Sequence, residues 1–228
     1  MTVYLDYNAT TPVLDEIADL VHKLMTEEYG NAGSRTHEYG VAAKRAVETA
    51  RAQVAEVAKA DKTEVIFISG ATESNNIAIL GLREFAQLSG KKHIITSKLE
   101  HKAVLEPIEH LEQQGFDVTY LNATAGGQVD ITQLKAALGD NTVLVSIMHI
   151  NNESGAIQPI AEICQLLAEH DAYLHVDAAQ SFGKYPFDLD NPRIDFISVS
   201  GHKLYAPKGI GALIMRRRGF MRPPLRPI

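Results

Sequence analysis

The sequence predicts an α/β fold in which a mostly parallel sheet carries helices on both faces. From residue 64 onward, short runs rich in β-branched residues alternate with segments of helical periodicity. Most of these runs have almost no polar face, which is typical of parallel strands that are covered on both sides. Strands that alternate with helices should be joined by right-handed crossovers.

The first expected helix covers 15–28 and has one apolar face, formed by Ile17, Leu20, Val21, Leu24 and Met25. A glycine-rich loop over 29–34 leads to a long alanine-rich helix over 36–60. Later helices are expected over 72–88, 103–114, 130–138 and 159–170. Asp130 and Gln133 have the spacing of a capping box, which marks the start of the helix over 130–138.

Strands are expected where β-branched and aromatic residues form short runs. The expected strands cover 3–5, 64–69, 93–96, 116–121, 142–148, 173–176, 195–199 and 210–215. In open α/β sheets, ligands bind beyond the carboxyl ends of the strands. Polar residues follow five of these strands, and we expect them to share one site.

Composition and charge narrow the class of protein. The chain has 228 residues, of which 45% are apolar and 22% charged, enough for one large globular domain. The net charge of −6 argues against a general nucleic-acid binder. A cluster of Arg216, Arg217, Arg218 and Arg222 is interpreted as a solvated run at a strand end.

Targeting signals and cysteine usage favour the cytoplasm. No apolar run reaches the ~18 residues that a membrane span needs, and the N-terminus has no charged and apolar signal regions. Cys164 is the single cysteine, which excludes an internal disulfide and fits a reducing compartment. Its helical spacing with Ile160, Ile163 and Leu167 predicts a buried structural thiol rather than a catalytic one.

Two residues at the ends of expected strands indicate a specific chemistry. Asp177 follows the strand over 173–176, and Lys203 follows the strand over 195–199 in the segment Ser-Gly-His-Lys. Pyridoxal phosphate requires a lysine amine for covalent attachment and an anion at its ring nitrogen. Each residue alone is compatible with an ordinary ion pair or an exposed strand end, but the pair favours a pyridoxal phosphate site.

Other polar residues fit the same site and also have simpler explanations. Ala71 and Thr72 join a strand to a helix, where free N–H groups bind phosphate, although a threonine-capped turn has the same sequence. His101 has the right chemistry to stack on a ring and move protons, or to be a surface or capping residue. Asn152 has an amide that suits a phenolic oxygen, but Asn also favours turns. Gln180 is a second amide at the strand ends.

Taken together, these motifs resemble the cysteine desulfurases of the class-V aminotransferase family. The matching stretches are Leu-Asp-Tyr-Asn-Ala-Thr-Thr-Pro at 5–12, Ser-Gly-Ala-Thr-Glu-Ser-Asn-Asn at 69–76, Glu-His at 100–101, Asn-Asn-Glu-Ser-Gly at 151–155, His-Val-Asp-Ala-Ala-Gln at 175–180, Ser-Gly-His-Lys at 200–203 and Lys-Gly-Ile-Gly-Ala-Leu at 208–213. They occur in order along essentially the whole chain. The resemblance implies a fold-type-I pyridoxal phosphate enzyme that removes sulfur from L-cysteine, releases L-alanine and forms an enzyme persulfide.

The resemblance also implies a role for each site residue. Lys203 would hold pyridoxal phosphate covalently, Asp177 would pair with its ring nitrogen, and His101 would stack on the ring and move protons. Asn152 and Gln180 would lie near the ring hydroxyl. The phosphate would be held by Ala71, Thr72, Ser200 and His202. The implied partners are a second copy of the chain in a homodimer and a sulfur-acceptor protein whose pathway the sequence leaves open.

Several parts of the family pattern would lie beyond residue 228. They are the nucleophilic cysteine, an arginine for the substrate carboxylate, a partner-donated phosphate ligand and most of a small domain. Residues 1–14 would belong with that small domain, and 15–228 would be a truncated cofactor-binding domain. The sequence therefore predicts doubtful complete activity for this chain. The alternatives are another class-V enzyme, such as an aminotransferase or selenocysteine lyase, or a non-catalytic scaffold.

Overall fold

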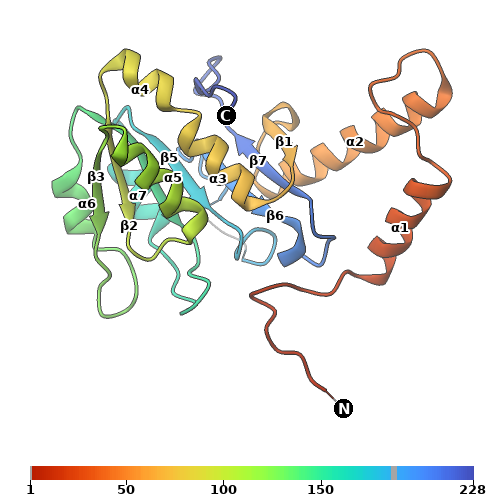
Figure 1. Cartoon of the computed structure of the whole chain (residues 1–228), viewed down its shortest axis with the longest axis horizontal. Coiled ribbons are helices and arrows are strands. Elements are labelled where there is room, and N and C mark those ends of the chain that lie inside the picture. Colours follow the sequence, from red (N-terminus) through yellow and green to blue (C-terminus); the bar gives the residue numbers. More distant parts are fainter. Residues whose placement is uncertain (1, 186–188) are drawn as a thin grey trace.

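One mixed sheet organises the molecule (Figure 1). The computed structural model describes residues 2–185 and 189–228, and these ranges contain seven sheet strands in the order β1-β7-β6-β5-β4-β2-β3. The strands are β1 (Val65–Ile68), β2 (His93–Ser97), β3 (Asp117–Leu121), β4 (Thr142–Met148), β5 (Tyr173–Asp177), β6 (Phe196–Ser200) and β7 (Gly211–Met215). All neighbouring pairs are parallel except those made by β7, so the predicted mostly parallel α/β sheet is confirmed.

Helices lie on both sides of the sheet. The longer ones are α1 (Asp15–Thr26), α2 (Glu38–Val57), α3 (Ala71–Leu80) and α5 (Lys102–Gln113). The shorter ones are α4 (Arg83–Ser89), α6 (Ile131–Ala137) and α7 (Ile160–Leu166), with single 3₁₀ turns η1 (Lys62–Glu64) and η2 (Gly201–Lys203). None of the helices in the described ranges combines the length and the apolar character needed to cross a bilayer.

The core has two halves, one on each face of the sheet. Ile94 and Leu144 belong to the cluster under α3, α4 and α5, whereas the next residues, Ile95 and Val145, belong to the cluster under α6 and α7. Adjacent strand residues point to opposite faces, so both neighbours are apolar only where both faces are covered. Cys164 is buried in the second cluster, as its helical spacing predicts.

Strand β7 runs antiparallel because its connection from β6 is too short for a crossover helix. Close packing here depends on Gly211. A Cβ at Gly211 would lie 2.6 Å from Cα of Gly70 and 2.4 Å from the carbonyl oxygen of Val199. The two glycines therefore bring the start of α3 directly against the end of the sheet.

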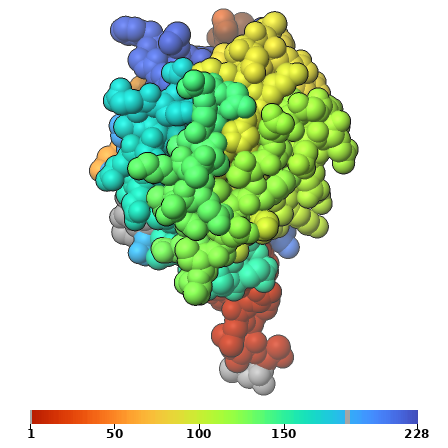
Figure 2. Space-filling model, turned by 90° about the vertical axis from the view of Figure 1, so that its left-hand side faces the viewer, coloured from red at the N-terminus to blue at the C-terminus, as the bar shows by residue number. Residues whose placement is uncertain are grey.

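The N-terminal part departs from expectation. The strand expected over 3–5 does not form, because none of the described strands supplies hydrogen-bond partners for its backbone. The side chains of Val3 and Leu5 are 69% and 85% exposed. The first helix does form, but none of its residues is buried, and Met25 is exposed. Figure 2 shows the red N-terminal residues extending beyond the rounded body. The apolar face of α1 is therefore uncovered in the single chain.

One expected helix is divided in two, and another ends earlier than the pattern indicates. The helix over 72–88 is divided into α3 and α4 at Gly81, whose carbonyl accepts a hydrogen bond from the backbone of Arg226. The helix expected to reach residue 170 ends at Leu166, because Arg193 binds the carbonyl oxygens of Leu167 and His170. Tertiary partners for the backbone account for both endings.

Two predicted local features are also changed by tertiary contacts. Asp130 caps α6 through the N–H groups of Thr132 and Gln133, but the Gln133 side chain accepts from Asn122 instead of closing the capping box. The arginine run is only partly solvated, because Arg216 is 5% exposed. The interpretation of this run as a solvated strand end is therefore wrong for Arg216, whose guanidinium replaces solvent with backbone carbonyls.

Candidate active site

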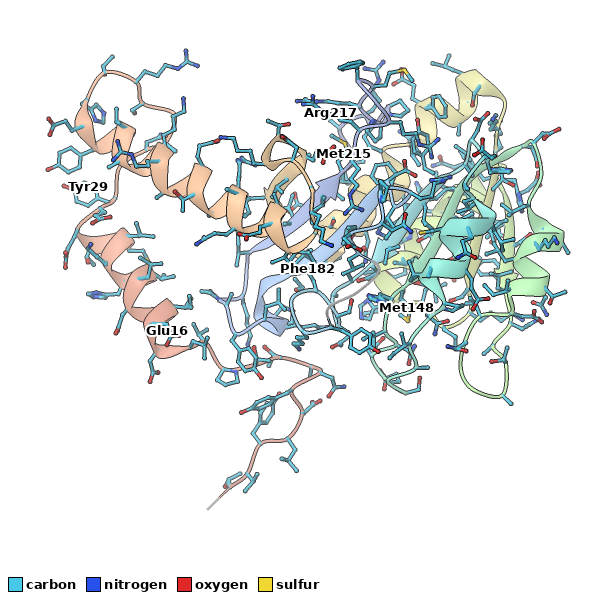
Figure 3. The ribbon with its side chains drawn as sticks, turned by 180° about the vertical axis from the view of Figure 1, so that it is seen from behind. Glu16, Tyr29, Met148, Phe182, Met215 and Arg217 are labelled. Carbon is cyan, nitrogen blue, oxygen red and sulfur yellow. The ribbon has the colours of Figure 1, made fainter. Side chains whose placement is uncertain are left out.

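The polar residues at the strand ends surround one cavity of about 870 Å³. It opens beyond the carboxyl ends of β4, β5 and β6, the side of the sheet on which Figure 3 labels Met148, opposite Met215. All nine residues that the sequence assigned to the site line this cavity: Ala71, Thr72, His101, Asn152, Asp177, Gln180, Ser200, His202 and Lys203. The structure thus brings together residues from five separate segments of the chain.

Asp177 ends β5 with its carboxylate held from two directions. Oδ1 accepts the backbone N–H of Ala179 at 3.0 Å, and Oδ2 accepts Nδ2 of Asn75 at 2.8 Å. Asp177 is 7% exposed, so these donors replace most of the solvent around the charge. Both oxygens of the carboxylate therefore have hydrogen-bond donors within the protein.

Lys203 enters the cavity from η2, directly after β6. Burial lowers the pKa of Lys203, while the charge of Asp177 acts in the opposite direction and raises it. A desolvated lysine loses part of its preference for the ammonium form and becomes a better nucleophile. The two groups therefore interact electrostatically across the same cavity, which is the arrangement that the sequence analysis required.

The start of α3 gives the cavity a region suited to an anion. Helix α3 starts there, and its N-cap, Gly70, has no side chain to occupy the first N–H groups. Thr72 and Ser200 add hydroxyl groups to the cavity lining. His202 also lines the cavity, but its Nδ1 lies 3.1 Å from Oγ1 of Thr10. A helix start with free N–H groups and adjacent hydroxyls is a suitable phosphate site.

His101 has two roles in the structure. It is the N-cap of α5, and its Nδ1 accepts the backbone N–H of Ala103 at 3.1 Å. This contact places the proton of a neutral imidazole on Nε2. The capping alternative from the sequence is therefore present, and the ring also lines the cavity, where the role of stacking and moving protons stays a prediction.

Asn152 and Gln180 meet the N-terminal segment. Gln180 donates through Nε2 to the carbonyl of Asn8 at 2.9 Å, and Nδ2 of Asn8 donates to the carbonyl of Asn152 at 3.0 Å. The Asn152 amide itself donates to Glu153. The segment is also fixed at Thr11, whose N–H and hydroxyl both donate to the carbonyl of His202. Residues 6–11 therefore cross the mouth of the cavity.

The side chains present fit pyridoxal phosphate. The cavity offers an amine, a carboxylate and a helix start in one space. Asn75 lines the same cavity, and its buried Oδ1 has no hydrogen-bond partner among the described residues. An orphaned buried oxygen beside Asp177 indicates a site built for a polar ligand. We therefore assign the nine residues as candidate ligands, with individual roles that remain proposals.

Sequence reasoning missed Asn75 and the Asn8 contacts. Asn75 belongs to a quoted motif but received no role, although it precedes Ala78 and Ile79 at helical spacing on a buried face. A polar residue on such a face needs a buried partner, and that signal identifies it. Asn8 gave no comparable signal, because its partners lie 144 and 172 positions away.

Known proteins resemble the chain in sequence. The IscS cysteine desulfurase of Shewanella sp. (strain ANA-3) is 50% identical over 224 residues, which are 97% of this chain and 55% of that protein. The IscS of Vibrio campbellii is 51% identical over the same share of each chain. The chain thus spans about half the length of these curated relatives.

Solved structures resemble the chain in fold as well. DndA from Streptomyces lividans is 55% identical with a TM-score of 0.89, covering 99% of this chain and 63% of that chain. SspA, solved in complex with cysteine, is 43% identical with a TM-score of 0.92, covering 100% of this chain and 64% of that chain. Residues 3–226 match the class-V aminotransferase family, and the chain therefore belongs to this family of pyridoxal phosphate-dependent enzymes.

Proposed function

We propose that this chain is the cofactor-binding part of a cysteine desulfurase, which removes sulfur from L-cysteine, releases L-alanine and passes the sulfur on through a persulfide. The observation that supports it most strongly is the shared cavity of Lys203, Asp177 and the start of α3. Relatives named cysteine desulfurase, at 50% identity, favour this activity among class-V enzymes.

Each residue would contribute through its own chemistry. Pyridoxal phosphate would supply an electron sink that stabilises negative charge at the substrate α-carbon. Asp177, held by Asn75 and Ala179, would keep a positive charge at the ring nitrogen. Lys203 would hold the cofactor and, when displaced by substrate, exchange protons through Nζ.

The remaining residues would bind and orient. The N–H groups of Ala71 and Thr72, with the side chains of Ser200 and His202, would hold the phosphate. His101 would cover the ring and move protons through Nε2, since Nδ1 is committed to Ala103. Asn152 and Gln180 would lie near the ring hydroxyl, so that the Gln180 amide would exchange its contact with Asn8 and the Asn152 amide its contact with Glu153 when the cofactor binds.

A direct test begins with cofactor attachment. The purified 228-residue chain is mixed with pyridoxal phosphate, reduced with borohydride and digested, and the labelled peptide is identified by mass spectrometry. We expect the label on Lys203 and its loss in Lys203→Ala, with an unchanged result for Lys135→Ala on the exposed face of α6. Labelling spread over surface lysines would reject the cofactor role.

The substrate class is tested separately. The loaded chain is incubated with L-cysteine, with L-selenocysteine, or with an amino acid and a 2-oxo acid, and alanine and transamination products are measured. Alanine from cysteine supports desulfuration, whereas preference for selenocysteine or transamination supports another class-V activity. Bound cofactor without any turnover is expected both of a non-catalytic scaffold and of a cofactor-binding part that needs the rest of a desulfurase for the sulfur step.

We further propose that the chain forms a homodimer in the cytoplasm. The uncovered apolar face of α1, which includes exposed Leu20 and Met25, supports the dimer because such faces mark association surfaces. Sedimentation analysis should give twice the monomer mass, and Leu20→Lys with Met25→Lys should lower it. A monomeric wild-type chain would contradict the proposed homodimer.

A further inference from the structure

A buried carboxyl group lies directly beside His101. Glu100 is 6% exposed and lies in the short loop that joins β2 to α5. Its Oε1 accepts two hydrogen bonds, from Oγ of Ser97 at 2.7 Å and from the backbone N–H of Met148 at 2.9 Å. Its Oε2 has no hydrogen-bond partner within the described ranges.

The geometry around Glu100 favours the neutral acid. No lysine or arginine of the described residues forms an ion pair with it, and an unpaired buried carboxylate is strongly disfavoured. Both donors meet one oxygen, which acts as the carbonyl of an acid and leaves the other oxygen to carry the proton. Burial raises the pKa of Glu100 to about 8; the hydrogen bonds from Met148 and Ser97 act in the opposite direction, and the charge of Asp177 adds a smaller increase.

The contacts of Glu100 tie the β2–α5 loop to the end of β4. Met148 is the last residue of β4, and Ser97 is the last residue of β2, so one carboxyl group bridges two strand ends. A second tie comes from Nδ2 of Asn151, which donates to the carbonyl of Leu99 at 3.0 Å. The loop that carries His101 to the cavity is therefore held at two points, one at the end of β4 and one in the segment that follows it.

We propose that Glu100 is a positioning residue, which as a neutral acid locks residues 97–101 onto the end of β4 and thereby fixes His101 at the cavity. The inference rests on the proposed function only for the role of His101 at the cavity, which is to cover the ring and move protons. The neutral form of Glu100 also matters for Asp177. If Glu100 were ionised, its carboxylate would compete with that of Asp177 for positive charge in the cavity.

The protonation state is tested in the cofactor-free chain. Infrared difference spectra at neutral pH should show a carboxylic-acid C=O band that disappears in Glu100→Gln. The matched control is Glu109→Ala, on the exposed side of α5, which should leave this band in place. Absence of a Glu100-dependent acid band in the wild-type chain would overturn the neutral-acid assignment.

The positioning role is tested with the same chains. The ring signals of His101, assigned by comparison with His101→Asn, should be unchanged in Glu100→Gln, because the amide oxygen can accept both hydrogen bonds. They should shift in Glu100→Ala, with pyridoxal phosphate binding weakened about tenfold. Ser97→Ala, which removes one of the two bonds and keeps the buried acid, should shift the His101 signals less.

Three outcomes decide between the explanations. Equal damage from Glu100→Gln and Glu100→Ala would show that an ionised carboxylate is required. Unchanged His101 signals in Glu100→Ala and Ser97→Ala would show that the loop is held without Glu100. If the wild-type chain binds no pyridoxal phosphate, the proposed function fails, while the infrared band and the His101 signals still decide this inference.

Discussion

Asn75 and Asp177 lie 102 positions apart, and Nδ2 of Asn75 donates to Oδ2 of Asp177 over 2.8 Å. Asn75 comes from α3, the helix whose start forms the anion site, and Asp177 comes from the end of β5. One hydrogen bond therefore links the helix that starts at the anion site to the carboxylate at the end of β5. It also fixes the orientation of the Asn75 amide, because an ionised carboxylate only accepts hydrogen bonds.

Asn75→Asp should disturb the cofactor site more than Asn75→Ala. In the aspartate variant, two carboxylates share one buried site and one of them takes up a proton. In the alanine variant, Asp177 loses a charge-assisted bond worth about 1.5–3 kcal/mol but keeps the N–H of Ala179. The measurements are pyridoxal phosphate affinity and the pH dependence of the absorbance of the bound cofactor.

The control for Asn75 is Asn122→Ala, an exposed asparagine that follows β3. It should change neither measurement. Equal affinities for the Asn75→Asp variant and the wild-type chain would show that Asp177 does not depend on its neighbour's charge.

Lys203→Met should stabilise the cofactor-free chain at pH 7. Burial lowers the pKa of Lys203, so the unfolded chain holds the proton more tightly than the folded chain does. Protonated Lys203 therefore costs stability fully below its folded pKa, and the cost disappears as the pH rises toward the unfolded value of about 10.4. Urea unfolding should show a higher free energy of unfolding for Lys203→Met than for the wild-type chain at pH 7. This difference should be smaller at pH 10.

Asp177 provides the opposing contribution, because its charge raises the pKa of Lys203. Asp177→Asn should consequently lower that pKa further, which the pH dependence of Lys203 acylation measures peptide by peptide. Exposed Lys135 serves as the internal reference. A higher apparent pKa for Lys203 in Asp177→Asn would contradict the proposed electrostatic pairing.

The strand pattern predicted the central sheet because burial on both faces leaves a plain signal. Ile94 and Ile95 contact opposite core clusters, and this requirement makes the whole run apolar. Asp177 and Lys203 were recognisable for the related reason that Asp177 ends an apolar strand and Lys203 lies three residues after the end of another. The sequence therefore contained both the sheet and the edge at which polar residues gather.

Features that depend on distant partners were not predictable from local pattern. Residues 3–5 have strand propensity, but propensity cannot supply the neighbouring strand that a ladder needs. The direction of β7 follows from the short connection after β6 and not from its own residues. Arg216 was interpreted as solvated because the sequence shows only that it lies in a run of charged residues. The carbonyl groups that bind its guanidinium come from distant segments of the chain.

His175→Leu should weaken the fold at neutral pH and reduce its sensitivity to acid. His175 is fully buried between Oγ of Ser146 at 2.8 Å and Oγ of Ser198 at 2.9 Å. Ser198 donates to Ser74, so it accepts from Nε2–H of His175. Burial lowers the pKa of this imidazole to about 4, which keeps it neutral at pH 7. Loss of both bonds should cost about 2–4 kcal/mol in free energy of unfolding.

The acid dependence has a definite sign. Burial lowers the pKa of His175 to about 4, so below the unfolded value of about 6.5 the unfolded chain takes up a proton that the folded chain does not. His175 therefore lowers the free energy of unfolding by about 1.4 kcal/mol for each pH unit as the pH falls toward 4. His175→Leu should have a shallower slope between pH 6.5 and 4, and exposed His22→Leu should match the wild-type chain. An identical slope in both variants would contradict a buried neutral imidazole.

Arg216→Lys should destabilise the chain far more than Arg217→Lys. The buried guanidinium of Arg216 donates to four backbone carbonyls, those of Asn191, Ile194, Ala58 and Leu189. A lysine has three donors on a single atom and cannot reach acceptors spread across a planar fork. Unpaired buried carbonyls should lower the free energy of unfolding by about 2–4 kcal/mol.

Arg217 is the matched control, because it is the next residue and lies in solvent-accessible surroundings, where it contacts Oγ1 of Thr63. Its replacement by lysine should change stability by less than about 0.5 kcal/mol. Urea unfolding of both variants at pH 7 compares them directly. Equal effects would mean that the carbonyls around Arg216 regain partners after the substitution, and that the guanidinium fork does not hold the residues after β7 against the body of the sheet.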